Sequence, residues 1–168
     1  LGRLLAARGL ASINELDHSL NGLLPPNQLK DIENAAKIVS TAIEENTSIL
    51  VVGDFDADGA TACALVVSAL RAMGVDSIDY LVPDRFKFGY GLSPEIVRFA
   101  ARLKPELLIT VDNGIASIEG VALANRLGMK VIVTDHHLPG SSLPAAAAIV
   151  NPKQPGCEFS SKNLAGVG

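Results

Sequence analysis

The sequence has few cysteines, no long apolar run and no excess of positive charge. Its two cysteines, Cys63 and Cys157, lie far apart without CxxC spacing, which argues against a disulfide framework or a thiolate zinc site. Charges and glycines interrupt every apolar run, so we expect neither a membrane span nor a secretory signal. These absences favour a cytoplasmic protein.

The formal net charge is −4, and this value argues against a generally basic surface for nucleic acid. Bound divalent cations would reverse the local field, however, so carboxylates crowded at one site can still meet a polyanion. The 168 residues, nearly half of them apolar, are enough for one globular domain with a sizeable core.

The pattern of apolar residues changes near residue 48. Residues 1–47 show helical periodicity that Pro25 and Pro26 interrupt, and they predict a helical segment that caps the domain. After it, short apolar runs typical of buried parallel strands alternate with candidate helices. The expected strands are 49–52, 78–82, 107–111 and 131–134, the expected helices are about 60–73, 94–103 and 118–127, and 151–168 is expected to be loop. The order predicts an α/β fold with an open, mainly parallel sheet and helices on both faces.

Each predicted strand leads into an aspartate. These aspartates are Asp54, Asp84, Asp112 and Asp135. Because the carboxyl ends of parallel strands share one edge, we expect the four carboxylates to converge. They would repel one another unless cations compensate, and oxygen ligands with imidazole suit Mn²⁺ or Mg²⁺, with zinc as an alternative.

Further polar residues follow Asp54 and Asp112. Asp54, Asp56 and Asp58 alternate before Gly59, and three acids in this pattern favour metal binding over a simple helix cap. Asp112-Asn113-Gly114 is ordinary turn chemistry, and only its place after a strand makes Asp112 a candidate ligand.

Asp135-His136-His137 is the sharpest local signal. Adjacent histidines do not easily share one ion, so one is expected to bind metal while the other contacts or protonates the substrate. Two solvated loop histidines are the alternative.

The segment 83–93 combines Arg85, aromatic residues and glycines near the same sheet edge. It predicts either a loop that clamps a phosphate or stacks a base, or a surface loop whose Phe side chains cover the core.

With these residues identified, the chain resembles the DHH phosphoesterase superfamily, named for the Asp-His-His triplet. The resemblance lies in residues 52–59, Arg85 with 89–93, 111–115 and 134–139, together with 151–152 and 164–168. It is greatest to bacterial members that degrade single-stranded DNA from the 5′ end with Mn²⁺ or Mg²⁺, releasing 5′ mononucleotides in DNA repair and recombination.

The resemblance implies roles for individual residues. Two divalent metal ions are expected on Asp54, Asp56, Asp58, Asp112 and His136, with Asp112 as a bridge, and the catalytic residues would be Asp112, Asp135 and His137. Substrate contacts are expected from Arg85, Tyr90, Gly91, Asn113 and His137, the last facing the scissile phosphate. Many superfamily members have histidine where Val52 stands, so which of the first three aspartates binds which ion stays open.

The resemblance also implies an organisation into parts. Residues 1–47 would be the N-terminal helical segment and 48–168 a catalytic domain truncated at its C-terminal end, with a further metal-binding aspartate and a DNA-holding second domain beyond it. We therefore expect the chain alone to bind metal weakly and to have little or no nuclease activity. Single-stranded DNA, a helicase and a single-strand-binding protein are the expected partners of a monomer.

Two other functions remain open from the residues. The same site could hydrolyse short oligonucleotides or small phosphoanhydrides, as in other members of the superfamily. Alternatively, the acids could be structural caps in a non-catalytic nucleotide-binding domain, although the glycine fingerprint of a dinucleotide site is absent after the first strand.

Overall fold

A computed structural model describes residues 2–17, 19 and 22–168, apart from the side chains of Ile13 and Arg85. Its centre is a five-stranded sheet in the order β2-β1-β3-β4-β5, in which every neighbouring pair is parallel. The strands are β1 (Ile49–Gly53), β2 (Ile78–Leu81), β3 (Leu107–Val111), β4 (Lys130–Thr134) and β5 (Ala148–Val150). Within the described residues, no helix has the length and apolar character to cross a membrane.

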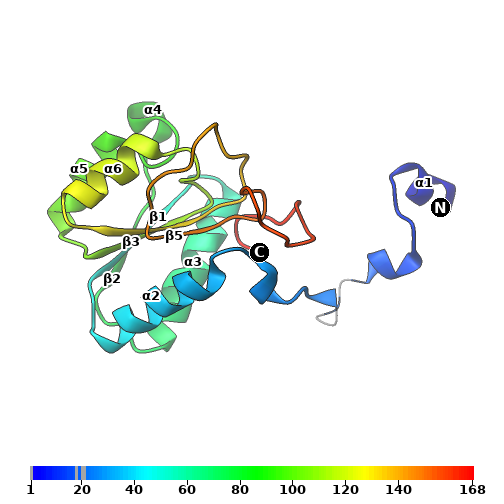
Figure 1. The fold of residues 1–168 in the computed structure, drawn as a ribbon, viewed down its shortest axis with the longest axis horizontal. Helices are drawn as coiled ribbons and strands as arrows, with labels where there is room; N and C mark the ends of the chain where they lie inside the picture. Colours follow the sequence, from blue (N-terminus) through cyan, green and yellow to red (C-terminus); the bar gives the residue numbers. More distant parts are fainter. Residues whose placement is uncertain (1, 18, 20–21) are drawn as a thin grey trace.

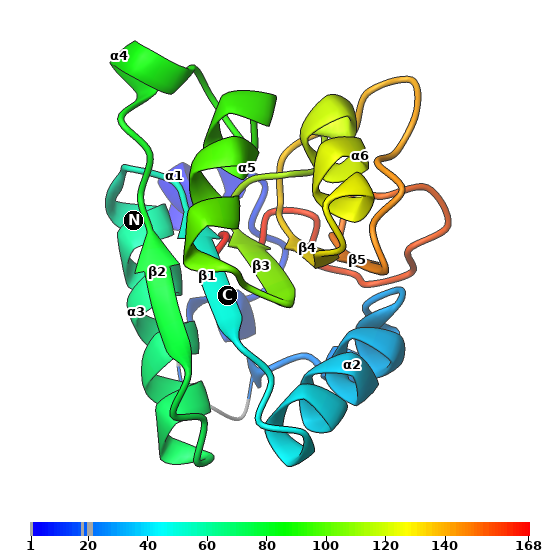
Figure 2. The same cartoon turned by 90° about the vertical axis from the view of Figure 1, so that its left-hand side faces the viewer.

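Helices cover both faces of the sheet (Figure 2). Side chains alternate along each strand, so Val51 joins one core cluster and its neighbour Val52 joins the other. The first cluster lies against α2 (Ile32–Glu44) and α3 (Ala57–Ala72), and the second against α5 (Pro94–Ala100) and α6 (Ile118–Arg126). The predicted α/β class with an open parallel sheet is therefore confirmed.

β5 is the strand that the sequence did not predict. It follows an alanine run that lacks β-branched residues until Ile149, so its pattern is weak. Asp31, just before α2, accepts a hydrogen bond from the Ile149 amide, and Asn34 donates one to the Ala147 carbonyl. Contacts distant in sequence therefore hold this edge strand in place.

The N-terminal residues form several short helical pieces. They are α1 (Gly2–Ala7), the 3-10 helices η1 (Ile13–Leu16) and η3 (Pro26–Gln28), and then α2. Helix α1 contains no buried residue, and Figure 1 shows the chain through η1 reaching away from the sheet. Among the described helices of this segment, α2 packs against the core of the domain through buried Ala35 and Ala42.

Two remaining short helices lie beside α5. Residues of the predicted 83–93 loop form α4 (Arg85–Phe88), and η4 (Ala101–Leu103) continues α5 by one 3-10 turn. Ser93 caps α5, since its hydroxyl accepts a hydrogen bond from the Ile96 amide at 3.4 Å, and Pro94 begins the first turn.

The packing of α6 near α5 depends on Gly120. A Cβ atom added to Gly120 would collide with the carbonyl group of Leu92. We expect Gly120→Ala to lower the free energy of unfolding by at least about 2 kcal/mol, because main-chain atoms must move to make room. Urea unfolding measures the effect, and exposed Glu119→Ala on the same helix is the control. An equal, small change in both variants would contradict the packing account.

Candidate metal centre

Three of the strand-end aspartates meet at the carboxyl edge of the sheet. β1, β3 and β4 are adjacent, with Gly53 paired to Val111 and Val111 paired to Thr134, so the residues that follow them lie side by side. The Asp112 amide donates to the Thr134 carbonyl at 3.0 Å, which extends the pairing by one residue. The predicted convergence of Asp54, Asp112 and Asp135 is correct.

Asp84 does not join them. Its carboxylate accepts a hydrogen bond from the Phe86 amide at 3.0 Å and lies 3.5 Å from the Lys87 ammonium group. The expectation that all four strand-end acids converge is therefore wrong at β2, where the carboxylate caps α4 instead. Asp84 follows an edge strand, and the chain turns away there to start that helix.

The turn from β1 into α3 places the first-motif aspartates. Asp56 caps α3 by accepting a hydrogen bond from the Gly59 amide at 3.0 Å, which confirms the helix-cap interpretation of this residue; its role as a metal ligand stays a prediction. A Cβ on Gly59 would collide with the main chain of Asp54, and this contact makes glycine necessary at that position. Oxygen atoms of Asp54, Asp56 and Asp112 lie within 4.8 Å of one another, close enough to share an ion.

Asp112 is the most constrained residue of the edge. It is 1% exposed, and its φ of 61° lies in the left-handed region that few residues other than glycine adopt. Burial, followed by the negative charge of Asp58, raises the pKa of Asp112 to about 6. Its Oδ1 atom is buried and accepts no hydrogen bond.

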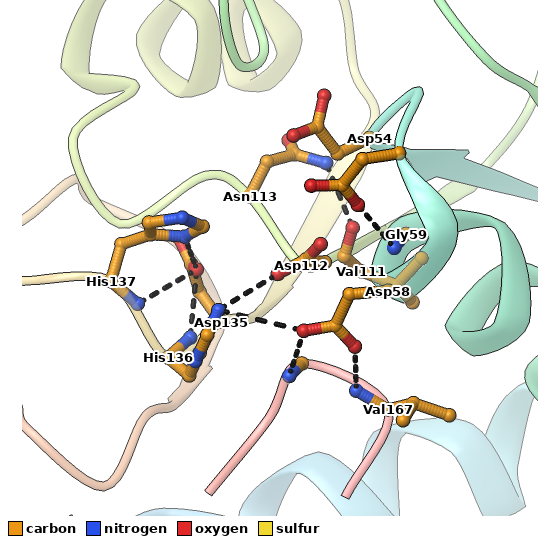
Figure 3. Close-up of polar contacts among 12 residues, drawn as sticks. Asp54, Asp58, Gly59, Val111, Asp112, Asn113, Asp135, His136, His137 and Val167 are labelled. Carbon is orange, nitrogen blue, oxygen red and sulfur yellow. Dashed lines mark hydrogen bonds and ion pairs between the residues drawn. The ribbon is translucent and has the colours of Figure 1, made fainter. Parts of the chain in front are cut away.

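His136 faces the same oxygen. Its Nδ1 atom lies 2.9 Å from the carbonyl oxygen of Leu164, which can only accept, so Nδ1 carries the proton of the neutral ring. The Nε2 atom then presents a lone pair 3.1 Å from Asp112 Oδ1 and 3.7 Å from Asp58 Oδ2 (Figure 3). Three acceptors directed at one another repel unless a cation lies among them. The donor set, with an Asp112 oxygen that accepts no hydrogen bond, therefore fits a divalent metal ion.

His137 is held differently. Its Nδ1 atom lies 2.7 Å from Asp135 Oδ1, and the Tyr90 hydroxyl lies 3.1 Å from Nδ1 and 3.2 Å from Nε2. Asp135 also accepts main-chain hydrogen bonds from Ile115, His136 and His137. Both oxygens of the Asp135 carboxylate thus accept hydrogen bonds, Oδ1 from the two histidines and Oδ2 from Ile115, and the His137 ring remains partly exposed at the edge.

The remaining expected substrate residues are distributed around this edge. Asn113 is buried, and its side-chain amide donates to the carbonyls of Val52 and Val111, which ties β1 to β3. Gly91, with a φ of 76°, lets the chain pass close to the Ser117 hydroxyl. The Arg85 side chain lies outside the described residues. Substrate contacts at Arg85, Tyr90, Gly91 and Asn113 stay predictions.

Two groups at the site carry part of the family resemblance but were given no role from the sequence. Asn151, fully buried after β5, donates to the His137 carbonyl at 3.0 Å. Its signal was an Asn directly after an apolar run, and it was missed because β5 was not predicted. Main-chain groups of residues 164–167 contact Asp58 and His136. Contacts made by main-chain groups leave no pattern of side chains in the sequence from which they could be predicted.

Comparison with known proteins agrees with this geometry. The family model described as DHH family, N-terminal domain, matches residues 48–168. The chain belongs to the DHH family. Over its whole length, the chain is 58% identical to the single-stranded-DNA-specific exonuclease RecJ of Salmonella typhimurium strain LT2, and the match covers 29% of that relative. The chain thus spans less than a third of the length of that curated DHH relative.

Two solved structures share the fold. Exonuclease RecJ bound to manganese is 34% identical with a TM-score of 0.77, over 87% of this chain and 37% of that one. RecJ from Thermus thermophilus in complex with Mn²⁺ is 32% identical with a TM-score of 0.74, over 96% of this chain and 22% of that one. The DHH fold of this chain is therefore shown by sequence and by structure.

The charge of Asp112 should destabilise the metal-free chain. Because its folded pKa of about 6 lies above its ordinary 3.8, the folded chain binds this proton more tightly than the unfolded chain does. The contribution of this proton to the free energy of unfolding is complete below about pH 4 and is lost as the pH rises through about 6. We expect Asp112→Asn, measured by urea unfolding in EDTA, to raise the free energy of unfolding more at about pH 7 than at about pH 4. If Asp112→Asn is less stable than the native chain at about pH 7, this expectation is wrong.

Proposed function

We propose that this chain forms the metal-binding part of a 5′-to-3′ exonuclease specific for single-stranded DNA. The observation that carries the proposal is the buried Asp112 Oδ1 atom, which accepts no hydrogen bond and lies 3.1 Å from His136 Nε2 at the edge of a DHH domain. Its similarity to RecJ, named a single-stranded-DNA-specific exonuclease in Salmonella typhimurium, supports the choice of substrate.

The side chains would hold two divalent cations. Oxygen atoms of Asp54, Asp56 and Asp112 lie close enough to hold one cation. Asp58 and Asp112 both face His136 Nε2 and would hold the other with it, so Asp112 would bridge the two. His137 also lies close enough to Asp112 and His136 to share an ion, but Asp135 holds its Nδ1 atom, so we assign His136 to the metal. Carboxylate and imidazole ligands suit Mn²⁺ or Mg²⁺, and manganese is bound in two similar RecJ structures. Two such cations acidify water and neutralise the charge that develops on a phosphodiester during in-line hydrolysis.

His137 would act on the substrate rather than bind metal. Asp135 fixes its Nδ1 atom as a donor, so the Nε2 atom is the one available to the Tyr90 hydroxyl or to a phosphate. In its protonated form the ring would donate a hydrogen bond to a phosphate oxygen or a proton to the leaving group. Asp135 serves this step by holding the ring and stabilising its positive charge.

The wider organisation belongs to the same proposal. Residues 48–168 would be the catalytic domain and 1–47 a helical segment before it, in a monomeric cytoplasmic enzyme of DNA repair and recombination. A helicase and a single-strand-binding protein are the partners that we propose, because single strands arise where these proteins act.

The exonuclease proposal is tested with the full-length protein in Mn²⁺. We expect release of mononucleotides from the 5′ end of single-stranded DNA. Asp112→Ala should lower this activity more than about 100-fold, because losing a ligand shared by both cations should cost more than losing a residue that only supports a ligand. Differently labelled 5′ and 3′ ends, separated on a gel, show the direction. Asp76→Ala is the matched control, because Asp76 is an exposed acid before β2, at the opposite edge of the sheet.

Short substrates distinguish the other enzyme functions. A dinucleotide and pyrophosphate are given to the same protein at equal concentration. Faster hydrolysis of either than of long single strands would contradict the exonuclease proposal, and so would full activity in Asp112→Ala.

A further inference from the structure

One short segment near the end of the chain contacts three of the proposed ligands. Residues 164–167 lie against the carboxyl edge of the sheet, and Figure 3 shows the Val167 amide directed at Asp58. The contacts involve main-chain atoms of Leu164, Gly166 and Val167. They are therefore a property of how the segment lies, more than of which side chains it carries.

Both oxygens of Asp58 are held by this segment. The Gly166 amide donates to Oδ2 and the Val167 amide donates to Oδ1, each at 2.8 Å. Two bonds from adjacent amides fix the plane of the carboxylate and prevent its rotation. Each oxygen keeps a further lone pair for a cation, and Oδ2 is the oxygen that faces His136.

The same segment fixes His136. The Leu164 carbonyl oxygen accepts from Nδ1 at 2.9 Å, which leaves Nε2 free of its proton and turned toward Asp112. A histidine that binds metal commonly donates its other ring N–H to a carbonyl or carboxylate in this way, and the partner sets the ring orientation and raises the basicity of the ligand.

Gly166 brings the segment against Asp112. A Cβ atom on Gly166 would collide with the Asp112 carboxylate, so a larger residue would push the segment away. The segment is anchored on both sides. The Val167 side chain packs against the core cluster of the α2 and α3 face, and Lys162 donates to the carbonyls of Pro152 and Cys157 at 2.7 and 2.8 Å.

We propose that residues 164–167 are a main-chain positioning element that orients Asp58 and His136 for the cation they share with Asp112. This inference rests on the proposed metal site and adds a requirement to it. The segment binds no cation itself. It restricts the side chains of Asp58 and His136 before a cation binds, so less conformational entropy is lost on binding. The affinity for metal therefore depends on the amides of the segment.

The test removes one amide and keeps the rest. Val167→Pro deletes the N–H group that bonds to Asp58, whereas Val167→Ala keeps that group and shortens only the apolar side chain. Mn²⁺ binding to the full-length protein is followed by the EPR signal of free Mn²⁺. We expect Val167→Pro to bind the ion about tenfold to a hundredfold more weakly than Val167→Ala.

A second pair protects the test against misfolding. If circular dichroism shows that Val167→Pro is unfolded, Gly166→Ala is compared with Asn163→Ala, at an exposed residue just before the segment. We expect Gly166→Ala to lose a similar factor in Mn²⁺ affinity and Asn163→Ala to lose none. The metal-free melting temperature shows whether a variant has lost its fold, and the EPR signal reports the metal site.

The outcomes separate the two proposals. Equal Mn²⁺ affinity in the folded variant and its control overturns the positioning element and leaves the metal site intact. No Mn²⁺ binding by the native protein overturns both, because Asp58 and His136 would then have no shared ion to be oriented for.

Discussion

Electrostatic repulsion at the carboxyl edge of the sheet is the constraint on which the rest of the site depends. The parallel order of β1, β3 and β4 carries the chain into an aspartate three times at one edge. Asp58 then adds a carboxylate from the first turn of α3. Burial of Asp112 beside that charge favours its protonated form, which is the reason for its raised pKa. A divalent cation bound there would remove the same penalty, so the metal site that we propose would couple metal binding to folding.

Asp112 and Asp135 lie at equivalent positions, each directly after a strand, but their surroundings differ. Both follow buried strands and both are almost fully buried. Asp135 accepts hydrogen bonds from three main-chain amides and from the His137 ring, so its charge is fully compensated by donors. Asp112 has an oxygen that accepts none. The first carboxylate therefore organises the loop, and the second is left for a cation.

Most of the fold and the identity of the edge residues could be predicted from the sequence. The β-branched runs such as 49–52 and 107–111 are typical of buried parallel strands, so these strands could be predicted. An aspartate directly after an inner strand of this kind lies at the carboxyl edge of the sheet. β5 could not be predicted in the same way, because its alanines have weak strand preference and its position depends on Asp31 and Asn34. Asp84 was misplaced since its strand lies at the sheet edge, where a local helix cap competes.

Main-chain contacts were the other part beyond prediction. Asn113 and Asn151 looked like turn residues, yet each joins neighbouring segments from a buried position. The Asp58 carboxylate meets amides more than a hundred residues away. In each contact one partner is a main-chain group whose position depends on the course of the chain, so the folded structure is needed to show it.

The central claim is that Asp112 lies between two cation sites. Anomalous X-ray scattering from crystals of the protein grown with Mn²⁺ tests it most directly, since the signal locates manganese without reference to activity. The account predicts one manganese peak beside Asp54, Asp56 and Asp112 and another beside Asp58, Asp112 and His136. Manganese peaks only elsewhere on the molecule, or none at this edge of the sheet, would contradict it.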